Sequence, residues 1–144
     1  MRKFALIAIL CSFCAAPAMA ADAVTAEVSK LQALKLETVK TADENTKLTE
    51  ADMKAQDEVF EALEGAVQAA VKKTTPELDA EILRVTVEML KKDPTQFAGE
   101  LVLPLYEKNK KSFLESLKKL SPSDAKLVED AVKMAARQKR YGNG

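Results

Sequence analysis

The stretch "TEADMKAQDEVFEALEGAVQAAVKK", residues 49–73, decides the fold class, because its large apolar side chains recur at helical spacing. They are three, four or seven residues apart and so share one helix face. They form the stripe Met53, Phe60, Leu63 and Val67. Thr49 can cap the first turn, where Asp52 meets the positive end of the helix dipole. We predict a helix of about 35 Å, whose stripe is either core or an interface.

The same spacing continues on both sides of this segment. We predict a first helix from Val24 to about Lys40, a third that starts at Thr75 and Pro76, and a last one after Ser121. Pro104 predicts a kink or break in the chain between them, because a proline ring clashes with the preceding helical turn. The expected fold is all-α, a compact or elongated bundle of about four to six amphipathic helices.

The first 20 residues are typical of a secretory signal peptide. A basic start at Arg2 and Lys3 is followed by the apolar residues 4–16 and by the small-x-small pattern that ends at Ala20. We expect cleavage after Ala20, which leaves residues 21–144 as a single helical domain with a flexible C-terminal tail at 141–144. The protein is then exported, to the periplasm or to the outside of the cell.

Both cysteines, Cys11 and Cys14, lie inside this predicted signal peptide. Leu10 and Phe13 precede them, whereas a lipoprotein signal has a small residue before the modified cysteine, so we do not expect a lipoprotein. The mature chain would contain no cysteine, and its stability would come from a packed core without disulfides.

The composition excludes many kinds of catalytic site. The chain has no histidine, and after cleavage it has no cysteine, which removes Ser-His-Asp triads, cysteine nucleophiles and imidazole or thiolate metal sites. Carboxylates and Ser–Lys pairs remain, but no spacing indicates a catalytic, cofactor or metal site. We predict a protein that is not an enzyme and has no cofactor. An envelope enzyme that uses carboxylates or a Ser–Lys pair is a further alternative.

Charge is uneven along the chain. Residues 21–100 contain 10 Lys and Arg against 17 Asp and Glu, whereas residues 101–144 contain 10 against 5. These two halves either attract each other within the domain, or the second half presents a basic surface to an anionic partner. The candidate surface consists of Lys108, Lys110, Lys111, Lys118 and Lys119. We expect no nucleic-acid partner, given the predicted export and the lack of a basic stripe that is interleaved with aromatic residues.

Two short segments are similar to each other: "LTEADMK" at 48–54 and "LSPSDAK" at 120–126. Helix capping accounts for both. They also resemble the Leu-Thr-x-x-Gln motif of small, exported, all-helical periplasmic chaperones of the Spy type, with Asp52 and Asp124 in the place of the glutamine. The resemblance covers only these few residues, and it implies a chaperone that binds other proteins.

These observations predict an exported helical protein that acts through protein–protein interaction or self-association, in one version as a chaperone. Its partner is an unknown protein or a second copy of the chain. The stripe from Met53 to Val67 and the basic region Lys108–Lys119 are the candidate contact surfaces. The alternative is a protein that binds a membrane surface or another anionic ligand through the basic region; a membrane is the less favoured partner.

Overall fold

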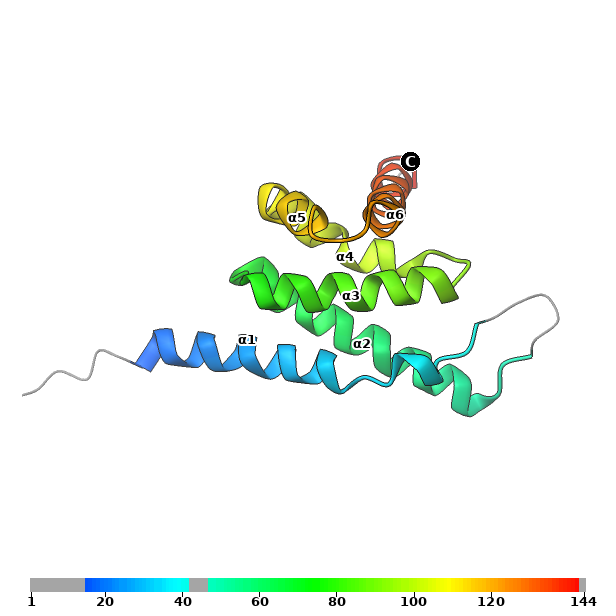
Figure 1. The fold of residues 1–144 in the computed structure, drawn as a ribbon, viewed down its shortest axis with the longest axis horizontal. Helices are drawn as coiled ribbons and strands as arrows, with labels where there is room; N and C mark the ends of the chain where they lie inside the picture. The colour runs from blue at the N-terminus through cyan, green and yellow to red at the C-terminus, as the bar shows by residue number, and fades with distance from the viewer. Residues whose placement is uncertain (1–14, 42–46, 143–144) are drawn as a thin grey trace, which may run out of the picture.

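The computed structural model describes residues 15–41 and 47–142, with side chains from Ala23 onward. Most of the predicted signal peptide, with both cysteines, lies outside these residues, as does most of the predicted loop at 41–47. The described part confirms the all-α class, and its six α-helices are at the upper end of the predicted number (Figure 1). They are α1 (Ala15–Ala33), α2 (Glu50–Lys72), α3 (Pro76–Lys92), α4 (Phe97–Lys108), α5 (Lys110–Leu117) and α6 (Pro122–Tyr141), with a 3₁₀ helix η1 (Leu36–Thr38).

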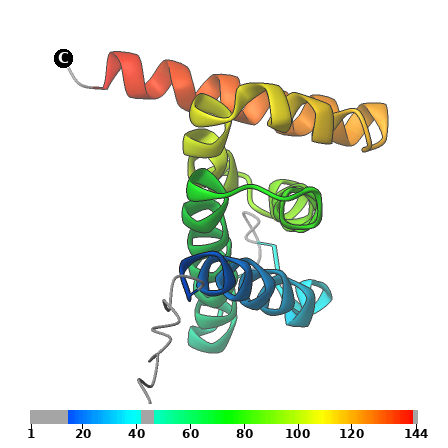
Figure 2. The ribbon, with the colours of Figure 1, turned by 90° about the vertical axis from the view of Figure 1, so that its left-hand side faces the viewer.

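Helix α3 is the centre of the molecule, since it packs against α1, α2, α4, α5 and α6. In Figure 1 it lies between α1 on one side and α5 and α6 on the other, and in Figure 2 it is seen end-on beside α2. Nine of its 17 residues are buried, which is why a helix forms across its β-branched run at 84–90. The hydroxyl of Thr86 donates to the Ile82 carbonyl at 2.7 Å, so this buried polar group is satisfied within the helix.

The end of the first helix differs from the prediction. Helix α1 stops at Ala33 rather than near Lys40, and the chain continues through η1 to the buried Val39. Side chains of α3 satisfy carbonyls at this end: the Arg84 guanidinium donates to Leu31 at 2.8 Å, and the Lys92 ammonium donates to Leu36. These long-range bonds replace helical ones that a longer α1 would make.

Three of the predicted helix starts, those of α2, α3 and α6, are confirmed, whereas α1 begins at Ala15 and not at the predicted Val24. The hydroxyls of Thr49, Thr75 and Ser121 each accept the backbone N–H three residues later, at 3.2 Å. At the start of α2, the Asp52 carboxylate also accepts the Thr49 N–H at 2.9 Å, which completes a capping box. The two similar segments at 48–54 and 120–126 are therefore two helix N-termini built in the same way.

Asp52 makes the stability of the α2 start depend on pH. Hydrogen bonds from Thr49 and the nearby Lys40 lower the pKa of Asp52 from 3.8 to about 2. Since the folded pKa lies below the unfolded one, the carboxylate stabilises the fold above about pH 4, and the contribution is lost as the pH falls toward 2. Asp52→Asn should therefore lower Tm at pH 7, and this difference in Tm should shrink as the pH falls from about 4 toward 2. Thermal unfolding followed by circular dichroism at several pH values measures it.

The matched control is Glu50→Gln, which removes the same charge from the same turn but leaves the Thr49 bonds in place. A Tm difference between Asp52→Asn and the unmodified chain that stays constant down to pH 2 would contradict this account.

Of the two alternatives predicted at Pro104, a kink or a break, the break is wrong. Helix α4 continues through Pro104 to Lys108, and the chain breaks instead at Asn109, whose φ and ψ of −124° and 45° are not helical. Pro104 has no N–H to donate to the Glu100 carbonyl, but its ring is exposed, and the other side of α4 is fixed in the core by Val102, Leu103 and Leu105. Burial therefore outweighs the missing hydrogen bond.

Helices α4 and α6 cross at two small residues. A Cβ on Gly99 would lie 2.8 Å from the Ala131 Cβ and 3.0 Å from the Ala131 carbonyl carbon and oxygen, so only glycine fits there. Gly65 in α2 has more room, because a Cβ there would meet only the Glu27 carboxylate, at 3.4 Å. Glu27 belongs to α1, so this glycine lies beside that helix.

A buried carboxylate connects α3 to α5. Asp79 is 2% exposed, and it accepts hydrogen bonds from the hydroxyls of Thr74 at 2.5 Å, Ser112 at 2.9 Å and Ser116 at 3.5 Å. It lies in the first turns of α3, where the helix dipole favours a negative charge. The short helix α5 is thus held to α3 by polar as well as apolar contacts.

Candidate binding surfaces

The predicted apolar stripe of α2 divides between core and surface. Leu63 and Val67 are buried, at 0% and 2% exposure, whereas Phe60 is half-buried and Met53 is 49% exposed. The stripe therefore runs along the edge of the core, and its first half is open to solvent.

Phe60 packs against the first residue of α4. Its ring and that of Phe97 meet edge-to-face, with centroids 5.1 Å apart and an angle of 89° between the ring planes. Phe97 is still 39% exposed, so the pair presents aromatic surface to solvent. Met53 continues this surface along α2, two turns before Phe60.

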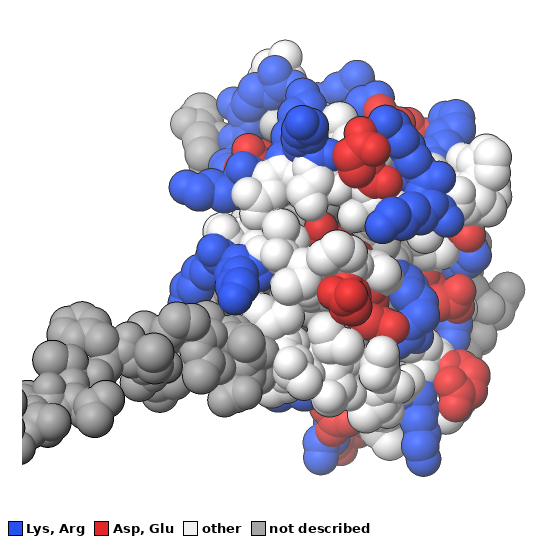
Figure 3. Space-filling model, turned by 60° about the vertical axis from the view of Figure 1, so that its left-hand side comes forward, with Lys and Arg blue, Asp and Glu red and all other residues white. Residues whose placement is uncertain are grey.

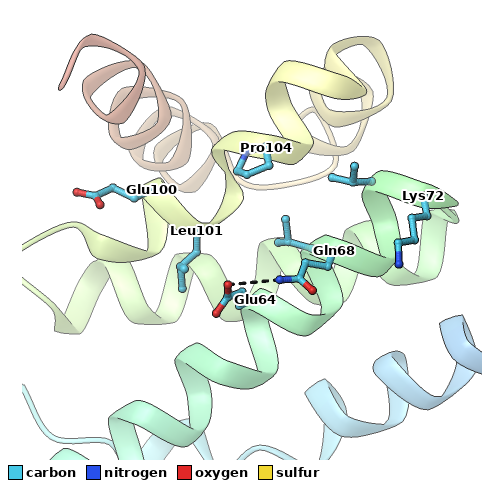
Figure 4. A pocket seen from close by; sticks show the side chains of 8 residues that line it. Glu64, Gln68, Lys72, Glu100, Leu101 and Pro104 are labelled. Carbon is cyan, nitrogen blue, oxygen red and sulfur yellow. Dashed lines mark hydrogen bonds between the residues drawn. The ribbon is translucent and has the colours of Figure 1, made fainter. Parts of the chain in front are cut away.

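Beyond the aromatic pair, α2 and α4 line a cavity of about 510 Å³ that is open to solvent. Its apolar wall comes from Val67 and Val71 of α2 and from Leu101 and Pro104 of α4, as the close view in Figure 4 shows for the two α4 residues. We call the aromatic pair and this cavity together the α2–α4 groove. Its residues are Phe60, Val67, Val71, Phe97, Leu101 and Pro104.

The edges of the groove are mainly acidic. Glu64 of α2 and Glu100 of α4 line it from both sides, and Gln68 donates to Glu64 at 3.4 Å (Figure 4). Neither glutamate forms an ion pair among the described residues, and Lys72 is the one cation in the cavity lining. The groove therefore combines an apolar floor with a negatively charged rim.

Sequence reasoning found only the α2 wall. Phe97, Leu101 and Pro104 follow each other at four and three residues, the spacing of one helix face, so a signal was present. This face was not recognised, because a kink or break was expected at Pro104 and an interrupted helix has no continuous face.

The five predicted lysines are all exposed, but they do not line the groove cavity. Lys108, Lys110 and Lys111 lie around the start of α5, and Lys118 and Lys119 follow its end. The Lys110 ammonium lies 5.4 Å from the Tyr106 ring centroid, and Lys118 pairs with Glu115 at 2.7 Å.

Ion pairs between the acidic first half and the basic second half are rare in the described part of the chain. Among the described residues, one ion pair joins the halves, between Lys91 Nζ and Asp124 Oδ1 at 3.0 Å, and its lysine belongs to the acidic half. The upper part of the molecule, formed by α5 and α6, accordingly presents many Lys and Arg side chains to solvent (Figure 3).

Three carboxyl groups at the surface have lowered pKa values. Hydrogen bonds from Lys118, Lys91 and Lys126 lower the pKa of Glu115, Asp124 and Asp130, respectively. These shifts favour the ionised form, so the groups act as hydrogen-bond acceptors and ion-pair partners at neutral pH.

Within residues 15–41 and 47–142 we find no group of His, Cys, Asp or Glu side chains placed to bind a metal ion. In the same ranges, no helix has the length and hydropathy that a bilayer span requires. Comparisons with protein-family models, with curated proteins and with solved structures gave no significant match. The resemblance of residues 48–54 and 120–126 to periplasmic chaperones therefore has no support from a family match.

Proposed function

We propose that this protein is exported and is not an enzyme, and that it binds an apolar segment of another protein in the α2–α4 groove. The single observation that carries the proposal is this groove: the partly exposed Phe60–Phe97 pair is followed, one turn further along α2 and α4, by an open cavity with an apolar wall. A chaperone that holds unfolded chains is one version of this function.

The size of the groove supports a helical or extended partner segment. Phe60 and Val71 are 11 residues apart, which corresponds to about 16 Å of helix, or three turns. An amphipathic partner helix could place its apolar face along this length, with anchors at intervals of three and four residues.

The charge of the rim supports a basic partner segment. Glu64 of α2 and Glu100 of α4 both belong to the cavity lining, and Glu61 and Asp57 are exposed on α2. A partner with Lys or Arg beside its apolar face would match these carboxylates, whereas an acidic partner would be repelled.

The first 20 residues support the proposed export. The basic start at Arg2 and Lys3, the apolar residues 4–16 and the small-x-small pattern that ends at Ala20 are typical of a cleaved secretory signal. Helix α1 begins at Ala15, so cleavage after Ala20 would remove its first six residues.

Phe97→Asp should weaken partner binding about tenfold, because it replaces an aromatic anchor with a charge. An aspartate in the first turn of α4 suits the helix dipole, so the fold should persist.

The protein is expressed with its own N-terminal segment, and its mass after processing identifies its N-terminus. A labelled synthetic peptide of about five helical turns, with one leucine face and lysines elsewhere, is titrated by fluorescence anisotropy. The same peptide with glutamates in place of lysines should bind more weakly at low salt.

Met134→Asp is the matched control, since Met134 is 40% exposed on α6, close to the 39% of Phe97. It should leave peptide binding unchanged. Absence of peptide binding, together with no delay in the aggregation of an unfolded client protein at equimolar ratio, would contradict the proposal. Light scattering tests whether the groove binds a second copy of the chain. A dimer that is dissociated by Phe97→Asp would show that it does.

A further inference from the structure

The outer face of α6 carries a line of cations. Lys126, Lys133, Arg137 and Arg140 follow each other at seven, four and three residues, and all four are exposed. They lie opposite the side of α6 that packs on the core through Val128, Ala131, Val132 and Ala135. The helix therefore has one fully buried side and one basic side.

Two exposed apolar side chains lie beside these cations. Met134 is 40% exposed and Tyr141 is 83% exposed, and their separation of seven residues puts them on the same side of the helix. Of the four large apolar side chains that are exposed in the described part of the chain, these two belong to α6, and the other two are Met53 and Phe97 on α2 and α4. We call the six residues the α6 outer face: Lys126, Lys133, Met134, Arg137, Arg140 and Tyr141.

Part of the positive charge on this face is not neutralised. Lys126 pairs with Asp130 at 2.6 Å, and Lys133 pairs with Glu129 at 2.7 Å. The Arg137 and Arg140 guanidinium groups have no acidic partner among the described ion pairs, although Arg140 Nε donates to the Ala136 carbonyl. Free positive charge is thus concentrated near Tyr141, at the end of the helix.

We infer that the α6 outer face rests on the surface of an anionic lipid bilayer. Lys and Arg can bind the lipid phosphates, while the Tyr141 ring and the Met134 side chain enter the headgroup region, as in helices that lie flat at an interface. The exposed apolar groups decide between a bilayer and a soluble polyanion, because a polyanion offers no apolar layer for Tyr141. This contact lies on α6 and does not depend on the groove.

The test uses the processed protein and vesicles of phosphatidylcholine with or without about one third of phosphatidylglycerol. We expect binding to the anionic vesicles that weakens with salt, and little binding to the neutral ones. Exchanging both Arg137 and Arg140 for Gln should weaken binding at least about tenfold. The control variant exchanges Lys72 and Lys73 for Gln, which removes two exposed cations from the end of α2, and it should bind nearly as the unmodified protein does.

Insertion of the α6 outer face can be measured directly, because the chain contains no tryptophan. Tyr141→Trp supplies a single reporter, whose emission should shift to the blue on anionic vesicles. Three results would overturn the inference. They are equal binding to anionic and neutral vesicles, an equal loss of binding in the arginine and the lysine double variants, and binding without a blue shift of the Trp emission. Equal affinity for heparin, unaffected by Tyr141→Ser, would show instead that the face binds soluble polyanions. The Phe97→Asp variant should bind vesicles as the unmodified protein does. Vesicle binding is therefore tested independently of peptide binding in the α2–α4 groove.

Discussion

Gly99→Val lowers the free energy of unfolding by about 3 kcal/mol, because any Cβ at this position overlaps α6. The Cβ would lie 2.8 Å from the Ala131 Cβ and 3.0 Å from the Ala131 backbone. Backbone atoms cannot rotate away as a flexible side chain can, so α4 and α6 must move apart. Helices separated at this crossing lose contacts along their whole buried length.

Urea unfolding followed by circular dichroism measures this loss, and Gly99→Ala gives a milder version if the valine variant does not fold. Ala131→Gly in the Gly99→Ala background removes the Cβ contact and should recover part of the loss. Gly65→Ala is the control, because the nearest group there is the Glu27 side chain at 3.4 Å. It should be neutral or should stabilise the fold by up to about 1 kcal/mol, from helix propensity. Similar losses at both glycines would contradict the account.

Asp79→Leu is expected to lower the free energy of unfolding by about 2–3 kcal/mol. Leucine has a similar size, so the effect comes from the hydroxyls of Thr74, Ser112 and Ser116, which lose their common acceptor. Asp79→Asn keeps one acceptor oxygen and should cost about 1 kcal/mol.

A combined variant tests this explanation. Adding Ser112→Ala and Ser116→Ala to Asp79→Leu removes the stranded hydroxyls, so the combined variant should be more stable than Asp79→Leu alone. Urea unfolding of the three proteins gives the comparison. A combined variant that is less stable than Asp79→Leu would show that the serines act independently of the carboxylate.

The starts of α2, α3 and α6 could be predicted from sequence because they depend on local contacts. Thr49, Thr75 and Ser121 cap their helices through a backbone N–H only three residues away. The same holds for the helical spacing that identified Leu63 and Val67 as neighbours, although it could not separate them from the exposed Met53. One periodic stripe served both as core and as surface.

The errors occurred where distant residues decide the local structure. Arg84 and Lys92 bind carbonyls 53 and 56 residues earlier in the chain and replace the last turns expected for α1. Pro104 stays helical because the opposite side of α4 is buried. The Phe60–Phe97 pair also joins residues from different helices. For the same reason only the α2 wall of the groove could be predicted.

The central place of α3 sets the order in which apolar surface is covered as the chain is synthesised. Leu31 of α1 is fully buried, but α1 packs on α2 and α3, so it remains uncovered until residues up to Lys92 have been made. At that stage α3 still lacks α4, α5 and α6 on its other side. The half-made protein thus displays the apolar surface of its most buried helix, which makes this the stage of greatest risk of aggregation.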